Sequence, residues 1–346
     1  MKKIKVFDFF SGCGGTSQGF RQAGMEIVFG LDYDHDASNS FRANFPQATF
    51  VNADIRDISD DAISHLINVD DDEFILFSGC APCQPFSKQN SNKRDDDPRL
   101  DLLKEFSRFV SYYLPDFVFV ENVPGMQKFN KNEGTFKYFL DKLTETGYSF
   151  DYKVMPAAWF GVPQTRERLV LLAAKNFSVQ LPLPTHGGSD NPFSTVRDWI
   201  GNLPPINAGE KHGIVPDHEA AKLTEINLKR IQSTPEGGSR EFWPEELILK
   251  CHRNHKGHTD VYGRLSWDKP ASGLTTRCIS YSNGRFGHPT QHRAISVREA
   301  ASLQTFPIDY KFTGSLQSRA KQIGNAVPPK MSEAIGKHLR KLIDGF

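Results

Sequence analysis

The chain has 346 residues, of which 38% are hydrophobic and 24% are charged, and its formal net charge is +1. A chain of this length can bury a sizeable core and form two domains, or one large domain with an insertion. The nearly neutral charge excludes a strong overall attraction to nucleic acid, and the lack of any apolar run of ~18 residues excludes a predicted membrane span.

Strand and helix patterns alternate over about the first 175 residues, which predicts an α/β fold with a mostly parallel sheet covered on both faces. Apolar runs that end in turn residues predict the strands, and amphipathic runs predict the helices. The expected strands are 3–10, 27–31, 49–51, 73–77, 117–120 and 169–174, and the expected helices are 16–23, 35–45, 60–67, 100–114, 136–144 and 330–343.

A region of different character begins at about residue 177. Prolines at 182, 184, 192, 204, 205 and 216 crowd its first part, which predicts a linker into an irregular region that extends to residue 312. Between Lys250 and His292, seven lysines and arginines oppose two aspartates, so this stretch carries a charge of +5. A polyanion would prefer this stretch, although a solvated basic face produces the same pattern.

The five cysteines do not form the even set that is typical of a disulfide framework. We therefore expect free thiols and a reducing compartment, and the charged residues near the start of the chain do not predict a signal peptide. The run 251–258, with one cysteine and three histidines, invites a zinc interpretation. It lacks a clear second pair of ligands, so no metal site is predicted.

Cys83 lies just past the apolar strand 73–77 and directly behind Pro82. Ligands of open α/β sheets bind beyond the carboxyl ends of such strands, and proline restricts the backbone that leads to the thiol. Cys83 is therefore a candidate nucleophile. The alternative is a buried structural thiol, which is what free cysteines usually are.

A glycine-rich turn follows the first strand, with Gly12, Gly14 and Gly15 at the start of the first helix. Glycines allow the backbone to approach a ligand, and the helix N-terminus offers free amide groups. Asp32 ends the second strand, where a carboxylate can accept hydrogen bonds from ribose hydroxyls, and Asp54 follows the third strand. These residues indicate an adenosine-containing cofactor, although tight turns and loop carboxylates are common in proteins of any function.

Further polar groups lie at the ends of two other expected strands. Glu121 ends its strand as Cys83 follows its own, so neighbouring strands would bring a carboxyl and a thiol to one pocket. Arg166 and Arg168 alternate on an extended segment, so both guanidiniums are expected on one side, suited to a phosphate or a carbonyl oxygen. The alternatives are a helix-capping or surface glutamate and a surface salt bridge with Glu167.

Taken in order, seven segments resemble the motifs of the DNA cytosine-5 methyltransferase family, and together they cover nearly the whole chain. They are DFFSGCGG at 8–15, NADI at 52–55, SGCAPCQPFS at 78–87, ENVPG at 121–125, QTRER at 164–168, REAASLQTFP at 298–307 and QIGNAV at 322–327. Each motif alone is modest, whereas the ordered set is highly specific. The stretch 177–292 matches the family least.

The resemblance implies the Rossmann-like fold of S-adenosylmethionine-dependent methyltransferases, with a smaller irregular target-recognition domain and DNA in the cleft between the two. It implies a catalytic and cofactor-binding domain over 1–180, a target-recognition domain and hinge over 181–312, and a C-terminal segment, 313–346, that returns to the catalytic domain. Aspartate at position 32 departs from the glutamate that the family more often has. The residues implied to bind S-adenosylmethionine are Phe10, Gly12, Gly14, Gly15, Asp32, Asp54, Ile55, Pro82, Asn325 and Val327.

The implied chemistry is methyl transfer to carbon 5 of cytosine. The thiolate of Cys83 would add to carbon 6, which turns the ring into an enamine whose carbon 5 can attack a sulfonium methyl group. Glu121 would hydrogen-bond ring nitrogen 3 and the exocyclic amine. Arg166 would hold the cytosine carbonyl, with Arg168 nearby. No residue is assigned as the base that removes the carbon-5 proton, and a water molecule could do this.

The target cytosine must be swung out of the duplex, because the base stack hides carbon 6. Gln84 opens a polar segment, 84–99, which is interpreted as a mobile loop that closes over the flipped base. Ser87 and Gln89 are candidates to fill the hole, and the alternative is a flexible surface loop. Base recognition is expected in the stretch of charge +5. Its candidate residues are Arg264, Arg277, Asn283 and Arg285.

The motifs leave two alternatives open: a transfer RNA cytosine-5 methyltransferase, and a catalytically silent DNA-binding protein of the same fold. A nicotinamide oxidoreductase is disfavoured, because a cysteine past the fourth strand supplies no hydride chemistry. The expected partner is double-stranded DNA in the bacterial cytoplasm, with no membrane involved. We expect a monomer that serves as the methylase of a restriction–modification system, with a cognate restriction endonuclease acting on the same site.

Overall fold

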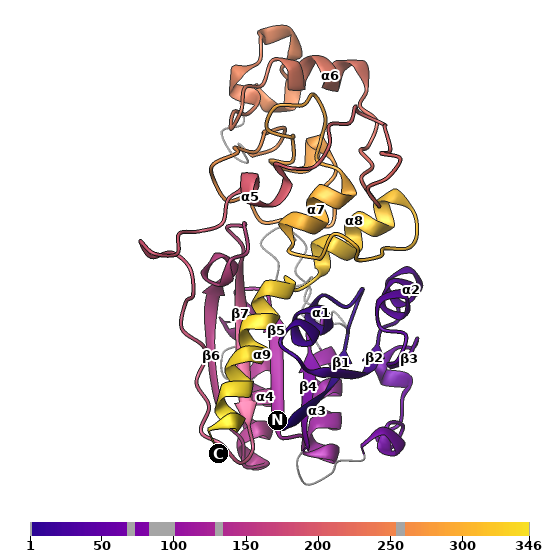
Figure 1. Ribbon diagram of the computed structural model, residues 1–346, viewed down its shortest axis with the longest axis vertical. Helices are drawn as coiled ribbons and strands as arrows, with labels where there is room; N and C mark the ends of the chain where they lie inside the picture. Colours follow the sequence, from indigo (N-terminus) through magenta and orange to yellow (C-terminus); the bar gives the residue numbers. More distant parts are fainter. Residues whose placement is uncertain (1, 68–72, 83–100, 129–133, 254–259, 346) are drawn as a thin grey trace. The chain divides into compact units, whose positions relative to one another are not determined.

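The computed structural model describes residues 2–67, 73–82, 101–128, 134–253 and 260–345 (Figure 1). The chain divides into two compact units. The first unit contains Met1–Pro156, Glu167–Pro184 and Val327–Phe346, and the second contains Ala157–Arg166 and Thr185–Ala326. These boundaries differ from the expected 1–180, 181–312 and 313–346, because the second unit takes a short segment from the middle of the chain and extends to Ala326. Within the described ranges, no helix combines the length and the apolar character needed to cross a membrane.

A seven-stranded sheet forms the centre of the first unit in the part of the chain that the structure describes, with strand order β3-β2-β1-β4-β5-β7-β6 (Figure 1). The strands are β1 (Lys3–Phe9), β2 (Glu26–Leu31), β3 (Thr49–Val51), β4 (Glu73–Gly79), β5 (Phe117–Asn122), β6 (Ser149–Pro156) and β7 (Glu167–Ala174). β1 to β5 pair in parallel, whereas β7 runs antiparallel to both of its neighbours. The expected α/β fold with a mostly parallel sheet is therefore confirmed.

Parallel pairing brings the carboxyl ends of β1, β2, β4 and β5 to one edge of the sheet. Phe9 of β1 pairs with Leu31 of β2 and with Gly79 of β4, so the turns that follow these three strands begin side by side. Ser78 of β4 pairs with Phe119 of β5. Open α/β sheets bind ligands beyond this edge, so the residues that follow these strands are the candidates for a functional site.

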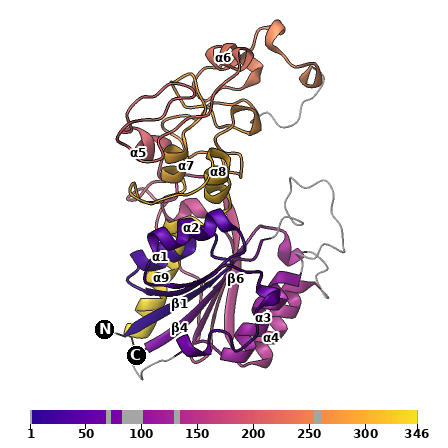
Figure 2. The ribbon, with the colours of Figure 1, turned by 90° about the vertical axis from the view of Figure 1, so that its right-hand side faces the viewer.

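Helices cover both faces of the sheet (Figure 2). α1 (Gly15–Gln22) and α9 (Pro329–Asp344) lie on one face, and α3 (Leu102–Tyr113) and α4 (Thr135–Glu145) lie on the other, while α2 (His35–Asn44) follows β2. α1 and α9 pack closely at Gly19, where an added Cβ would lie 2.1 Å from Ser332 Oγ and 2.2 Å from the carbonyl oxygen of Pro329. Glycine at position 19 therefore allows the C-terminal helix to pack against the helix that follows the glycine-rich turn.

Aromatic side chains fill the layer between the sheet and α3. Phe9 of β1 is completely buried, and its ring centroid lies 5.1 Å from that of Phe77 on β4 and 5.3 Å from that of Phe106 on α3. Aromatic pairs at such distances add favourable ring–ring contacts to the burial of their apolar area. The strands that lead to the carboxyl edge of the sheet are therefore held by a closely packed core.

Two segments of the first unit differ from the predicted elements. Residues 60–67, expected as a helix, form turns and the 3-10 helix η2 (Ser64–Leu66). Ile63 is the only buried residue of this segment, and so short a helix is marginal without an apolar face to pack. β6 was not predicted, because most of its side chains are exposed or half-buried and it lacks the apolar run that marks a central strand.

The second unit is built from short helices joined by irregular segments. Its α-helices are α5 (Val196–Ile200), α6 (Glu225–Gln232), α7 (Val297–Leu303) and α8 (Leu316–Asn325). Within the described residues of this unit, β-pairing is limited to isolated bridges such as that between Arg264 and Gly287. This is in keeping with the irregular region that the prolines predicted, although α7 and α8 were not among the expected helices.

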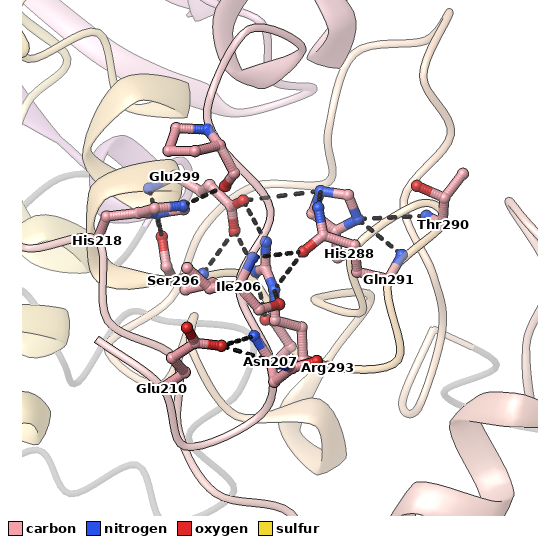
Figure 3. A network of polar contacts seen from close by, with 12 residues as sticks. Ile206, Asn207, Glu210, His218, His288, Thr290, Gln291, Arg293, Ser296 and Glu299 are labelled. Carbon is pink, nitrogen blue, oxygen red and sulfur yellow. Dashed lines mark hydrogen bonds and ion pairs between the residues drawn. The ribbon is translucent and has the colours of Figure 1, made fainter. Parts of the chain in front are cut away.

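A buried polar network holds α7 to the loops around it (Figure 3). Arg293 donates from Nη1 and Nη2 to the two carboxylate oxygens of Glu299, at 2.6 and 2.7 Å. His288 Nε2 lies 3.6 Å from Glu299 Oε1, while its Nδ1 accepts hydrogen bonds from the amides of Thr290 and Gln291. Burial opposes the charged form of the ring and lowers the pKa of His288 to about 4, so the imidazole in this network is neutral.

Candidate active site

The turn after β1 exposes main chain at the carboxyl edge of the sheet. Phe10 has a φ of 58°, Gly12 a φ of 53°, and Gly14, which precedes α1, a φ of 90°. A left-handed backbone costs a residue with a side chain about 1–3 kcal/mol, and such strain is concentrated at functional sites. The conformation of Phe10 is therefore typical of a residue in a functional site. A Cβ built on Gly12 meets nothing within 4 Å, so a ligand can approach the main chain here.

Asp32, which directly follows β2, is tied to this glycine-rich turn. Its Oδ2 accepts a hydrogen bond from the Gly12 amide (2.9 Å), and its Oδ1 accepts one from the Asp34 amide (2.8 Å). A carboxylate offers about four acceptor sites, enough for these amides and for a pair of ribose hydroxyls. The next residue, Tyr33, is 65% exposed. Tyr33 was not predicted as a site residue, although an exposed aromatic ring next to a carboxylate expected to bind ribose indicates stacking on a base.

Asp54 and Ile55, expected to contact an adenine ring, have different surroundings. Asp54 is half-buried, and its carboxylate accepts hydrogen bonds from Nε and Nη2 of Arg56, at 2.9 and 2.6 Å. These hydrogen bonds lower the pKa of Asp54, so the group is anionic and an adenine amine would share it with Arg56. The side chain of Ile55 is buried in the core cluster, so it supports the position of Asp54 rather than presenting a broad contact face.

The two C-terminal residues expected to bind the cofactor fall in different units. Val327 is buried and begins the last segment of the first unit, just before α9. Pro329, two residues later, packs against Gly19 of α1, so Val327 enters the first unit beside that helix. Asn325 is the exposed last residue of α8 and belongs to the second unit.

The segment that leads to Cys83 is anchored on the neighbouring strand. Asn122, the last residue of β5, donates from Nδ2 to the carbonyl oxygen of Ala81 at 3.1 Å, and both residues are buried. The hydrogen bond is shielded from water and holds the chain just before the half-buried Pro82. This role of Asn122 was not predicted, and its signal was a polar residue at the end of a buried strand. Cys83, Gln84, Ser87 and Gln89 lie outside the described residues.

Glu121 and Arg168 form an ion pair between β5 and β7. Arg168 Nε lies 2.7 Å from Glu121 Oε1, and the two side chains are 16% and 10% exposed, respectively. The two groups carry opposite charges, so they attract each other electrostatically. Charges removed from water persist only when they are paired, so each group holds the other at the carboxyl edge of the sheet. Glu121 is on β5, the strand next to β4, and Arg168 is on β7.

Arg166 has different partners from those of Arg168. Its Nη1 donates to the carbonyl oxygens of Leu274 and Gly324, each at 3.0 Å, and its side chain is buried in the second unit. Alternation along an extended segment predicted both guanidiniums on one side, whereas Arg168 alone pairs with Glu121 among the described residues. The chain passes from the second unit to the first between the two arginines. The alternation of side chains along an extended strand therefore does not predict the directions of these two guanidiniums.

A buried carboxyl group, Asp8 on β1, was not singled out by the sequence pattern. Ser17 Oγ on α1 donates to Asp8 Oδ2 at 2.6 Å. Burial raises the pKa of Asp8 to about 7, although hydrogen bonds from Ser17 and Ser78 oppose the shift. Burial also raises the pKa of the Cys80 thiol, and the charge of Glu121 adds to this effect. Cys80 is therefore an uncharged thiol and a poor nucleophile.

The arginines expected to read bases are not equivalent. Arg264 is 2% exposed and donates to backbone carbonyl groups of its own unit, so its guanidinium is engaged inside the unit. Arg285 is half-buried and pairs with Asp260, whereas Arg277 is exposed. The sequence does not show which basic side chains make hydrogen bonds inside the unit, because the carbonyl groups that accept these bonds are distant in the chain.

Comparisons with known proteins find similar sequences and structures along nearly the whole chain. The family model for C-5 cytosine-specific DNA methylases matches residues 4–341. The chain is 39% identical to the type II methylase M.HgiDII of Herpetosiphon aurantiacus, over 99% of this chain and 96% of that protein. It is 35% identical to the type II methyltransferase M1.HphI of Haemophilus parahaemolyticus, over 98% of this chain and 87% of that protein. A solved DNA modification methyltransferase encoded within an E. coli prophage aligns with a TM-score of 0.77 and 25% identity, over 99% of this chain and 100% of that chain.

Proposed function

Because the chain belongs to the family of C-5 cytosine-specific DNA methylases, we propose that it transfers a methyl group from S-adenosylmethionine to carbon 5 of cytosine in a specific sequence of duplex DNA. The observation that carries the proposal is the Glu121–Arg168 ion pair at the end of β5. β5 is the neighbour of β4, the strand that leads to Pro82 and Cys83. A carboxylate, a guanidinium and a thiol can therefore act on one ring.

The residues after β1, β2 and β3 fit an adenosine-containing sulfonium compound. Gly12 offers open main chain, and Asp32 offers carboxylate acceptors for ribose hydroxyls. Tyr33 supplies an exposed aromatic ring next to Asp32, and Asp54 supplies an anionic acceptor for the adenine amine. S-adenosylmethionine, when bound, supplies the methyl group on its sulfonium sulfur.

The proposed reaction begins when the thiolate of Cys83 bonds to carbon 6 of the cytosine, which moves an electron pair to carbon 5. Glu121 accepts a hydrogen bond from the exocyclic amine, and a proton that it shares with ring nitrogen 3 relieves the charge that builds on the ring. Carbon 5 then takes the methyl group. Loss of the carbon-5 proton to a base or to water allows the sulfur–carbon bond to break, which restores the aromatic ring and the thiolate.

Arg168 takes over the role first expected of Arg166 in this scheme. Its guanidinium is held next to Glu121, so it can donate to the carbonyl oxygen at carbon 2 of the same base. Arg166 is engaged with backbone carbonyl groups of the second unit, and we propose a structural role for it. The pair of opposite charges would thus address both polar edges of the ring.

The substrate base must leave the duplex before Cys83 can reach carbon 6, which costs a few kcal/mol. We propose that the polar segment containing Gln84, Ser87 and Gln89 closes over the flipped base. The second unit would recognise the DNA sequence, and its stretch 250–292, with a charge of +5, would contact the polyanion.

The biological setting is proposed from relatives that are named type II methylases and methyltransferases. By analogy, this chain would modify one sequence as a monomer in the cytoplasm of a bacterium. A cognate restriction endonuclease would cut the same sequence when it is unmodified.

Methylation assays on duplex DNA and on transfer RNA test the proposal. With labelled S-adenosylmethionine, we expect methyl transfer to duplex DNA, and bisulfite sequencing after expression in an unmethylated host should show one short sequence modified. Turnover confined to transfer RNA would overturn the DNA assignment. Lack of transfer to any DNA, with DNA binding retained, would favour a catalytically silent DNA-binding protein.

A further inference from the structure

Arg264, one of three arginines expected to read bases, is part of the internal framework of the second unit. Its Nε donates to the carbonyl oxygen of Thr234 at 2.6 Å, and its Nη2 donates to that of Ile231 at 2.8 Å. Its Nη1 donates to the carbonyl oxygens of His288 and Gln291, at 2.7 and 2.6 Å. These buried acceptors would lose their partners if Arg264 turned toward DNA, so it stays in place.

Arg285 is also anchored within the second unit. Its Nη1 donates to the carbonyl oxygens of Gly237 and Gly238, at 2.7 and 2.9 Å. Its Nε donates to Asp260 Oδ1 at 3.0 Å, and the side chain is 23% exposed. A bidentate contact with a base needs two neighbouring N–H groups of the guanidinium, and for Arg285 it would compete with these hydrogen bonds.

Arg277 differs from the other two arginines. Its residue is exposed, and among the described residues its guanidinium makes one hydrogen bond, from Nη1 to Asn283 Oδ1 at 3.4 Å. Asn283 is held in turn, because its Nδ2 donates to Ser280 Oγ at 2.7 Å. The bond from Arg277 is at the long end of the range, so it orients the guanidinium without engaging most of its donors.

The loop that carries Arg277 is held firmly from inside the second unit. Its neighbours Cys278 and Tyr281 are 0% and 2% exposed. A Cβ built on Gly324 of α8 would lie 2.2 Å from the carbonyl oxygen of Thr275, so α8 packs directly on the backbone of the loop. A rigid backbone presents a side chain to a partner with little ordering on binding.

We infer that Arg277 reads a guanine of the recognition sequence in the major groove, and that Asn283 is the residue that positions its guanidinium. The inference rests on the proposed function, because it takes duplex DNA as the substrate. The guanidinium fork matches O6 and N7 of guanine, and this is the commonest specific contact in the major groove. Lysine keeps the charge and can still donate to N7 of guanine without the planar fork, so Arg277→Ala, which removes every donor, is the variant that tests the contact.

The test uses the full chain and begins with the recognition sequence, determined by sequencing DNA that the wild-type protein has methylated. kcat/KM is then measured on duplexes in which 7-deazaguanine, which lacks the N7 acceptor, replaces one guanine at a time. In the wild type, one such replacement should lower kcat/KM by about tenfold. In Arg277→Ala, the replacement at that position should have no effect, and in Arg277→Lys its effect should be smaller than in the wild type.

Two further variants sharpen the comparison. Asn283→Ala should weaken the effect of the same replacement without abolishing it, because the guanidinium is less well oriented. Lys229→Ala, which removes an exposed cation of the same unit outside the stretch 250–292, should keep the wild-type response at every guanine. Calorimetric binding of S-adenosylmethionine should be the same in all variants, which shows that the first unit is folded.

The outcomes separate this inference from the function on which it rests. A response to 7-deazaguanine in Arg277→Ala equal to that of the wild type would overturn the inference and assign the N7 contact to another residue. A wild-type protein that methylates no DNA would instead contradict the proposed function, before any variant is compared, and the inference would end with it.

Discussion

Glu121 and Arg168 are held 2.7 Å apart, Oε1 to Nε, at the carboxyl edge of the sheet, and both side chains are mostly buried. They come from strands that pair antiparallel, with Glu121 opposite Val170 of β7. Removal of one member of a buried pair leaves the other charge without compensation, which destabilises a protein strongly. The pair therefore couples the stability of this edge of the sheet to the chemistry proposed there.

Replacement of Glu121 by glutamine should lower methyl transfer by about a hundredfold or more, the effect expected for a positioned acid or base. The amide keeps the shape of the side chain and removes the charge that Arg168 requires, so the free energy of unfolding should also fall. Transfer of labelled methyl groups and denaturant unfolding measure the two effects. Glu167→Gln, an exposed carboxylate nearby, is the control and should change neither, and full activity in Glu121→Gln would contradict the proposed role.

Replacement of Cys83 by serine should abolish methyl transfer and keep S-adenosylmethionine binding. An alcohol is far less ionised than a thiol, so the covalent step cannot begin. Cys80→Ser is the matched control, because burial keeps the Cys80 thiol protonated and its activity should stay near that of the wild type. Retained turnover in Cys83→Ser, measured over several cycles, would exclude the covalent route.

Replacement of Asp32 by alanine should raise the Kd for S-adenosylmethionine by about tenfold to a hundredfold, since hydrogen bonds to a charged group contribute ~1.5–3 kcal/mol. The change also removes the acceptor for the Gly12 amide, which loosens the turn. Isothermal titration calorimetry gives the Kd. Asp57→Ala, an exposed carboxylate, should bind as the wild type does, and so should Asp32→Glu if the longer side chain reaches the same hydroxyls. Unchanged affinity in Asp32→Ala would remove this residue from the cofactor site.

Replacement of Gly19 by alanine should destabilise the protein by about 1–3 kcal/mol or more, because the new methyl group has no room between α1 and α9. The added Cβ would lie 2.1 Å from Ser332 Oγ and 2.7 Å from the amide nitrogen of Glu333. Alanine favours an isolated helix by about 1 kcal/mol, so a lower urea midpoint shows that the packing term dominates. Gly213→Ala meets nothing within 4 Å and is the control. A stabilised Gly19→Ala variant would contradict the close packing of the C-terminal helix.

The contribution of His288 to the free energy of unfolding should fall as the pH is lowered from about 6.5 to about 4, because His288 is buried as the neutral form. The raised pKa of Asp8 acts in the opposite direction over this window, but Asp8 is present in the wild type and the variant alike, so its effect cancels in their difference. In this window the unfolded chain binds a proton that folded His288 does not, and linkage then lowers the stability by up to about 3 kcal/mol. His288→Asn retains an acceptor for the amides of Thr290 and Gln291, and its stability should decline less over this window. Denaturant unfolding at several pH values measures the difference between the two proteins. Parallel curves would show that His288 titrates normally.

Local patterns were sufficient to predict the architecture of the first unit. Short apolar runs identified the central strands, because a strand buried on both faces has no polar side to show. The glycine-rich turn and Asp32 were found because their positions relative to strand ends follow from the way parallel sheets bind ligands. The prediction of a helix over 60–67 was wrong, and β6 was not predicted. Both segments are largely exposed, and their secondary structure is decided by what they pack against.

The partners of the arginines could not be predicted in this way. Arg264 donates to carbonyl groups of residues up to 33 positions away, and Arg166 to that of Gly324, which is 158 positions away. Nothing in the sequence distinguishes these side chains from the exposed Arg277. The same is true of Arg168, which pairs with Glu121 because β7 enters the sheet antiparallel.

The sequence by itself determined the family, the kind of sheet and the residue types that the proposed chemistry needs, because these depend on local periodicity and on motifs of a few residues. Only the tertiary structure decided which carboxylate meets which guanidinium, which arginine is buried and which is exposed. The physical reason is that a charged side chain leaves water only where the fold provides partners for it, and those partners come from segments that chain order does not bring together.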